Sequence, residues 1–180
     1  MIGLALLALA LADAGSSARP CVPVAADHLK PTPSAIEDHR SPRAALGVPM
    51  PQAPTMVMLY GKGGHLSTQE YSIVLIRADD GAWRGTAVGR SQIWVQGAPY
   101  TPMKEKDWTL AKAAAKELED AISRRCPVDR AAPSGASRSL PPPRGYISER
   151  VDVLTPNHAP ITFYASEGDG TIAQVIRPPD

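Results

Sequence analysis

A glycine-rich segment with a lysine and a histidine, Gly61-Lys62-Gly63-Gly64-His65, contains the first residues that could bind an anion. Glycines leave backbone N–H groups accessible, and a cation beside them adds charge to such a site. A phosphate-binding loop reads G-x-x-x-x-G-K-[ST] and leads into a helix, whereas this segment stands between two predicted strands. It therefore fits a connection between strands, with Lys62 and His65 as candidates for ligand contact.

Two acid-histidine pairs, Asp27-His28 and Asp38-His39, lie in a proline-rich part of the chain. Carboxylate and imidazole groups can bind zinc or copper. A metal site needs several ligands that converge on a rigid frame, and a proline-rich segment offers no such frame. We therefore expect solvated loop residues here, with no metal and no other cofactor.

Nucleophilic catalysis requires a Ser, Thr or Cys beside a base that a third group orients. Ser67 follows His65 by two residues, but the sequence contains no G-x-S-x-G motif. We assign no catalytic residue from the sequence. A hydrolase-like enzyme would need a site assembled from distant segments, with His65 and His158 as its general bases.

Trp83 and Trp94 lie on one predicted strand at a spacing that directs their side chains to opposite faces. One is expected in the core and the other at the surface. On an open face, Trp94 together with Tyr100 would be an anchor for a protein or small ligand. The alternative is that Trp94 packs under the helix or under a proline-rich segment.

An apolar run from Ile2 to Ala12 opens the chain and is followed by small and polar residues. The run is too short for a bilayer, which takes about 20 residues to cross, and Ala-x-Ala sites follow it. No Lys or Arg precedes it. The run predicts a signal peptide over residues 1–14 and a periplasmic or secreted protein; the alternatives are a short buried helix and lipid attachment at Cys21.

The chain has two cysteines, Cys21 and Cys126, and the expected compartment oxidises thiols. We therefore predict a disulfide between them, which would attach the N-terminal arm to the domain. The chain-entropy model gives such a long loop closure about 4 kcal/mol of stabilisation. The wide spacing favours a structural bond over a redox-active one.

Charge and hydropathy exclude two classes of partner. The net charge is +1, and Lys and Arg are spread along the chain without a basic block. Nucleic acid is therefore not an expected partner, because binding to phosphates needs clustered cations. After the signal, no segment is apolar over the length that a membrane span requires.

The centre of the chain predicts an antiparallel meander. Residues 55–60, 70–78 and 83–96 are expected as strands, and Asp79-Asp80-Gly81 supplies a hairpin turn. Gly85 and Gly89 within the last strand suggest a bulge or bend.

One long helix is expected over residues 101–125. Thr101-Pro102 provides an N-cap and a proline at the first helical position, and the following residues favour helix. Trp108, Leu118 and Cys126 fall on one apolar stripe of that helix.

Two proline-rich segments flank this region, residues 19–54 and the linker at 127–145. We expect no regular helix in the first, because proline removes a backbone donor and fixes φ. Residues 148–154, 161–165 and 171–176 are expected as further strands, the last after a Gly168-Asp169-Gly170 turn.

The predicted fold is α+β: an antiparallel sheet of about five to six strands, with one long helix packed on one face. A proline-rich N-terminal arm (15–54) precedes a single domain (55–180). The predicted function is an exported, non-enzymatic domain that binds a protein or small ligand in the bacterial cell envelope. The alternatives are the hydrolase-like enzyme and a structural envelope protein.

Overall fold

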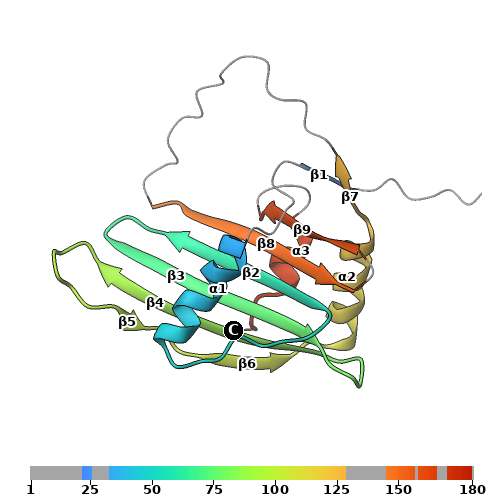
Figure 1. Cartoon of the computed structure of the whole chain (residues 1–180), viewed down its shortest axis with the longest axis horizontal. Helices are drawn as coiled ribbons and strands as arrows, with labels where there is room; N and C mark the ends of the chain where they lie inside the picture. The colour runs from blue at the N-terminus through green and yellow to red at the C-terminus, as the bar shows by residue number, and fades with distance from the viewer. Residues whose placement is uncertain (1–21, 26–32, 129–144, 157, 166–169, 180) are drawn as a thin grey trace, which may run out of the picture.

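The computed structural model describes residues 22–25, 33–128, 145–156, 158–165 and 170–179. A seven-stranded antiparallel sheet forms its centre, and helices cover both faces (Figure 1). In chain order the elements are β1 (Val22–Ala25), α1 (Pro33–Ala45), β2 (Met56–Gly63), β3 (Ser67–Arg77), β4 (Trp83–Ile93), β5 (Thr101–Pro102), β6 (Lys106–Thr109), α2 (Lys112–Ser123), β7 (Arg125–Val128), β8 (Ile147–Thr155), β9 (His158–Tyr164) and α3 (Thr171–Val175).

The strand order is β5-β4-β3-β2-β8-β9, and β6 also pairs with β4. The predicted meander of β2, β3 and β4 is confirmed, and β8 and β9 extend the sheet on the other side of β2. The predicted bulge in β4 is wrong, because β3 and β4 pair from Ser67↔Ile93 to Arg77↔Trp83 in one continuous register.

The glycines of β2 and β4 make room for aromatic rings on neighbouring strands. Gly85 pairs with Trp108 of β6, and Gly61 pairs with Tyr71 of β3. In each pair the ring lies over the glycine, so a Cβ added there would overlap the ring. Covering a strand glycine with an aromatic ring is a known device of β-sheets.

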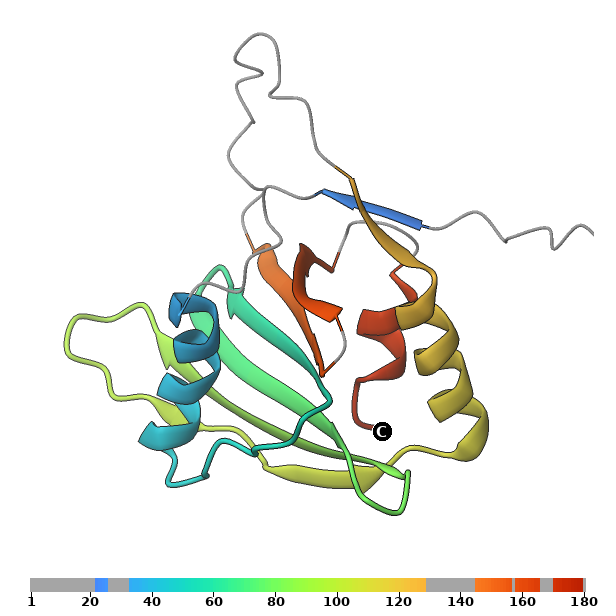
Figure 2. The same cartoon turned by 45° about the vertical axis from the view of Figure 1, so that its right-hand side comes forward.

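One face of the sheet is apolar and packs against α2 and α3 (Figure 2). Side chains alternate along each strand, so every second residue of β2, β3 and β8 enters this core. The buried core residues are Val57, Leu59, Ile73, Leu75, Trp83, Val151, Val153 and Phe163 from the strands and Leu118, Ala121, Ile172, Ala173 and Ile176 from the helical side.

The opposite face is covered by α1, which packs against β3 and β4 (Figure 1). Our expectation that the proline-rich segment holds no helix is wrong. Pro33 is the first residue of α1, where no backbone donor is needed, and Pro42 lies inside the helix. Burial of His39 and Arg43 against the sheet outweighs the poor intrinsic propensity of this segment.

The prediction of a single long helix over residues 101–125 is also wrong in its first half. Residues 101–102 and 106–109 pair with β4 as β5 and β6, and α2 covers only Lys112–Ser123. Hydrogen bonding to the outer edge of β4 thus outweighs the helix propensity of residues 101–109. Similarly, Thr171–Val175 is the helix α3 and not a strand. The α+β class is confirmed, with three short helices in the described residues in place of one long one.

Several predictions concern residues outside the described part of the chain: the signal peptide at 1–14, Cys21, and the linker from 129 to 144. The disulfide therefore stays a prediction. Its surroundings are informative, because β1 directly follows Cys21 and pairs in parallel with β7, in which Cys126 stands opposite Pro23.

Among the described residues, no helix has the length and apolar character needed to cross a membrane.

We predict that Gly85→Ala destabilises the fold by about 1–3 kcal/mol, because the new methyl group must displace the Trp108 ring. In a Trp108→Ala background the same substitution should cost much less. Urea denaturation of the four proteins in this double-mutant cycle measures the coupling. Equal costs of Gly85→Ala in both backgrounds would contradict the packing described here.

Candidate functional site

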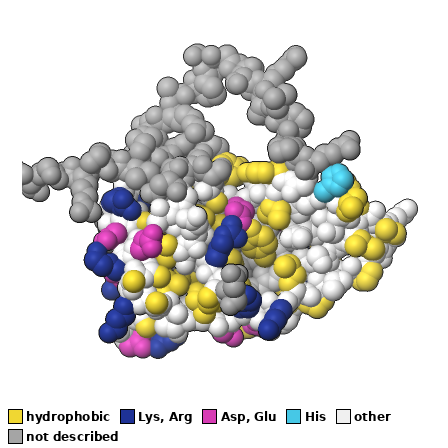
Figure 3. All heavy atoms as spheres, turned by 180° about the vertical axis from the view of Figure 1, so that it is seen from behind, with side chains coloured by type: hydrophobic (Ala, Val, Ile, Leu, Met, Phe, Trp, Pro, Cys, Tyr) yellow, Lys and Arg dark blue, Asp and Glu magenta, His cyan; other side chains and the backbone are white. Residues whose placement is uncertain are grey.

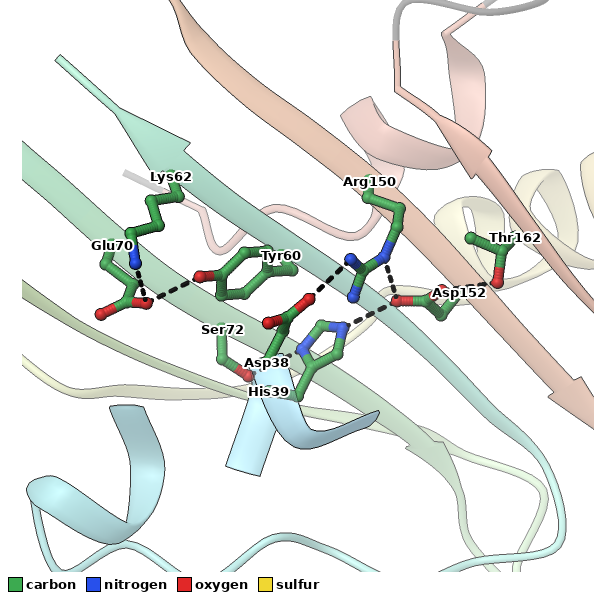
Figure 4. Close-up of polar contacts among 9 residues, drawn as sticks. All are labelled: Asp38, His39, Tyr60, Lys62, Glu70, Ser72, Arg150, Asp152 and Thr162. Atoms are coloured by element: carbon green, nitrogen blue, oxygen red, sulfur yellow. Dashed lines mark hydrogen bonds and ion pairs between the residues drawn. The ribbon is translucent and has the colours of Figure 1, made fainter. Parts of the chain in front are cut away.

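The face of the sheet beneath α1 carries a connected set of polar side chains, which we call the polar layer (Figure 4). Strand register explains the grouping: Tyr60 pairs with Ser72 on one side and Arg150 on the other, so all three share a face. The polar layer consists of the nine residues labelled in Figure 4, which are Asp38 and His39 of α1, Tyr60 and Lys62 of β2, Glu70 and Ser72 of β3, Arg150 and Asp152 of β8, and Thr162 of β9. Arg43 of α1, which donates to Ser72, completes it.

His39 is the centre of the polar layer. Its Nδ1 lies 3.0 Å from Ser72 Oγ, and its Nε2 lies 3.0 Å from Asp152 Oδ2. His39 and Ser72 have no exposed surface and Asp152 is 1% exposed. Serine, histidine and aspartate in mutual contact are also the residue types of a hydrolase triad.

The hydrogen bonds around His39 assign its protons. Arg43 Nε donates to Ser72 Oγ at 3.0 Å, so the Ser72 hydroxyl is left to donate its own proton to His39 Nδ1. His39 Nε2–H then donates to Asp152, whose two oxygens also accept from Arg150 Nε and Thr162 Oγ1. The network is fully consistent with a neutral imidazole.

Electrostatics favours the same protonation states. Burial lowers the pKa of His39 below its usual value, and the positive charges of Arg150 and Arg43 act in the same direction against the attraction of Asp152. For Asp152, burial acts to raise the pKa, but the hydrogen bond from His39 and the charge of Arg150 outweigh it and lower the pKa. Asp152 is therefore ionised beside a neutral His39.

The arrangement does not meet the requirements of nucleophilic catalysis. Ser72 is fully buried, and the Arg43 guanidinium donates both to its hydroxyl and to its backbone carbonyl. In hydrolase triads Nε2 faces the serine and Nδ1 the aspartate, which is the reverse of His39. A nucleophile must also touch its substrate. In this conformation the cluster can hold α1 on the sheet but cannot attack a substrate.

Lys62 belongs to a second group of contacts, around Glu70. The Glu70 carboxylate accepts from Tyr60 Oη at 2.7 Å and pairs with Lys62 at 3.2 Å and Arg90 at 2.6 Å. Burial acts to raise the pKa of Glu70, but these hydrogen bonds outweigh it and lower the pKa. The Lys62 ammonium thus contacts a carboxylate of its own chain.

The glycine-rich segment is mostly strand in the structure. Gly61 and Gly63 belong to β2 and pair with both β3 and β8. The connection to β3 is limited to residues 64–66, and His65 is exposed there. His158 begins β9, and its side chain lies outside the described part of the structure.

The most exposed large apolar residues gather where β3 begins and β4 ends, and we call this group the apolar tip. It consists of Leu66, Ile93, Trp94 and Val95, which are 78%, 59%, 71% and 62% exposed. The space-filling view shows hydrophobic side chains gathered at this end of the molecule, on the right in Figure 3. Tyr100, on the connection from β4 to β5, and Met103, directly after β5, are also exposed.

Backbone and side-chain bonds join the two segments of the apolar tip. Trp94 N–H donates to the Leu66 carbonyl at 3.2 Å, and the Trp94 indole N–H donates to Thr68 Oγ1 at 2.8 Å. Trp83, by contrast, is 1% exposed in the core. One tryptophan is buried and the other exposed, as expected, but Trp94 lies one residue beyond the end of β4, so strand alternation is not the cause. Tyr100 does not form a purely aromatic surface with Trp94, because the Arg90 guanidinium stacks on the Tyr100 ring. The guanidinium carbon lies 4.1 Å from the ring centre.

Sequence reasoning missed Ser72, Arg43 and Asp152 and treated His39 as a loop residue. The partners of His39 lie 33 and 113 positions away in the chain. The one available signal was the polar alternation of β8, where Arg150 and Asp152 point away from the valine core.

Comparison of the chain with protein-family models, with curated proteins and with solved structures finds no match in any of the three.

We predict that the stability of the protein falls as the pH drops below about 6.5. The unfolded chain protonates His39 near that pH, whereas the folded chain resists protonation because its pKa is lowered. The slope from this group reaches at most about 1.4 kcal/mol per pH unit. His39→Gln keeps a donor toward Asp152 but cannot ionise, so it should flatten this slope.

Urea denaturation between pH 5 and 8 measures the effect. The loss of stability below about pH 4, where Asp152 and Glu70 become protonated in the unfolded chain, should remain in the variant. A slope between pH 5 and 6.5 that is identical in the wild type and His39→Gln would contradict the neutral, buried imidazole.

Proposed function

We propose that this chain is an exported, non-enzymatic binding domain and that the apolar tip is its binding surface. The observation that carries the proposal is the exposure of Leu66, Ile93, Trp94 and Val95 at one end of the sheet. Isolated exposed apolar residues need no explanation, but a contiguous group that includes a tryptophan is typical of an interaction site.

The rigidity of the apolar tip supports a binding role. The tip stands on the β3–β4 hairpin, whose strands pair in an unbroken register, and its indole is fixed to Thr68. A side chain that is ordered before binding loses less conformational entropy when its partner arrives. Exposed tryptophan that is held in place therefore suits an anchor better than a flexible loop would.

The burial of Ser72, His39 and Asp152 speaks against a hydrolase site built on these three residues. The described serine, histidine and aspartate that lie in contact have no surface through which a substrate could reach the Ser72 hydroxyl. Their hydrogen bonds join α1 to β3 and β8, which accounts for them as structural groups. A buried network of this kind fixes one arrangement of its elements.

Two features of the chain support export to a periplasmic or secreted location. The apolar run Ile2 to Ala12 has the length and the flanking small residues of a signal peptide. In addition, β1 follows Cys21 and pairs with the strand that contains Cys126, so a disulfide would join two segments that already lie together. Such a bond forms in an oxidising compartment.

The test of the binding surface is fractionation of cells that produce the full chain. We expect the wild type to associate with the cell envelope and the double variant Ile93→Ser/Val95→Ser to be released into the soluble fraction. Both substitutions exchange exposed side chains, so thermal stability should be nearly unchanged. Tyr164→Ser, an exposed residue of β9 at the opposite edge of the sheet, is the control. Equal retention of the double variant in the envelope would refute the assignment of the apolar tip.

The non-enzymatic assignment has its own test. A serine-reactive fluorophosphonate should add no mass to the folded protein, because Ser72 is fully buried and bound to Arg43. Intact mass spectrometry followed by peptide mapping makes the measurement. An adduct on Ser72 that His39→Gln abolishes would instead establish a working triad.

A further inference from the structure

We infer that the apolar tip binds a lipid bilayer by inserting its side chains into the interfacial region of the membrane. The inference rests on the proposed function, because it names the partner of the same surface. Three properties of the apolar tip carry it: the types of its side chains, the distribution of charge around it, and its convex position.

The side-chain types match those of membrane-interface segments. Leu66, Ile93 and Val95 offer hydrocarbon, and all are more than half exposed. Trp94 adds an indole, which prefers the boundary between acyl chains and headgroups. Its N–H already donates to Thr68, so the ring can enter an apolar region without losing a hydrogen bond to water.

The charge around the apolar tip also favours a membrane. From Gly63 to Gln69 and from Ser91 to Met103 the sequence has no Asp, Glu, Lys or Arg. A charged side chain in either segment would oppose insertion into a bilayer. Protein-binding surfaces, in contrast, commonly have a polar and charged rim around an apolar centre.

The charged groups next to these segments leave a positive excess. Lys62 and Arg90 both pair with Glu70, which is 4% exposed, so the three side chains carry one net positive charge. Lys62 itself is exposed on the side of the β2–β3 connection. This arrangement suits anionic headgroups.

The position of the apolar tip is convex. The connection from β4 to β5 extends beyond the last pair of β3 and β4, Ser67↔Ile93, and projects from the sheet at the left of Figure 1. Cavities lined by described residues, with volumes near 270, 320 and 450 Å³, lie at other places in the fold. None of these three cavities is lined by a residue of the apolar tip, and a projecting surface can enter a bilayer, which adapts to its shape, more readily than it can fit a peptide or small molecule.

The test uses the full chain and protein-free vesicles of phosphatidylethanolamine and phosphatidylglycerol. We expect the wild type to sediment with the vesicles and its tryptophan emission to shift to shorter wavelength. Trp83 is buried in the core and Trp108 lies over Gly85, so the shift reports Trp94. Lipids brominated on the upper part of the acyl chain should quench this emission.

Matched variants assign the binding to the apolar tip. Trp94→Ala and Ile93→Ser/Val95→Ser should each weaken vesicle binding by at least about tenfold, since each removes exposed apolar surface that the bilayer would cover. Trp94→Phe should bind more tightly than Trp94→Ala, and Tyr164→Ser should bind like the wild type. Circular dichroism of each variant checks that the fold is retained.

The outcomes separate this inference from the proposed function. If vesicles fail to bind the protein while envelope fractions bind it through the apolar tip and lose it after protease treatment, the partner is a protein and the inference fails alone. A dimer that forms through the apolar tip and masks it would likewise overturn the inference. If neither vesicles nor envelope depend on the apolar tip, both proposals fail. Vesicle binding that is equal in all variants also refutes the inference.

Discussion

The hydrogen bonding of one neutral imidazole fixes the layer structure of this protein. His39 accepts from Ser72 of β3 and donates to Asp152 of β8, so a single side chain ties α1 to two strands that β2 separates. The buried charges beside it depend on this contact: Asp152 balances Arg150, and Arg43 is held by Ser72 and by the carbonyl of Thr86. Removing the imidazole would leave the buried Ser72 hydroxyl without its acceptor and Asp152 without one of its three donors, which is costly.

The two faces of the sheet are stabilised in different ways. The face under α2 and α3 buries hydrocarbon and tolerates exchange among apolar residues of similar volume. The face under α1 depends on hydrogen bonds with fixed directions, so it specifies one position of the helix. Burial lowers the pKa of Arg43 to about 10, which shows how strongly this face is desolvated even beneath a single helix.

Apolar runs bounded by turn residues were sufficient to predict β2, β3 and β4, and alternation of apolar and polar residues predicted β8. It could not predict β6, where only four residues pair with β4 and the local composition favours helix. Nor could it predict α1, whose helical state depends on burying His39 and Arg43 against strands far along the chain. The polar layer was missed for the same reason: its members meet only when α1, β3 and β8 assemble. The predicted strand over residues 83–96 ends at Ile93, so Trp94 is exposed because it lies beyond the sheet and not because of strand alternation.

The two ends of the β3–β4 hairpin are constrained differently, because one end is packed in the core and the other is exposed. Leu75 and Trp83 at one end of the hairpin belong to the packed core, whereas Ile93 and Leu66 at the other end touch little of it. A substitution at the far end therefore has little effect on folding yield. In evolutionary terms, residues at the core end of the hairpin are under selection for stability, whereas residues at the far end are free of that constraint and are selected only for what they contact.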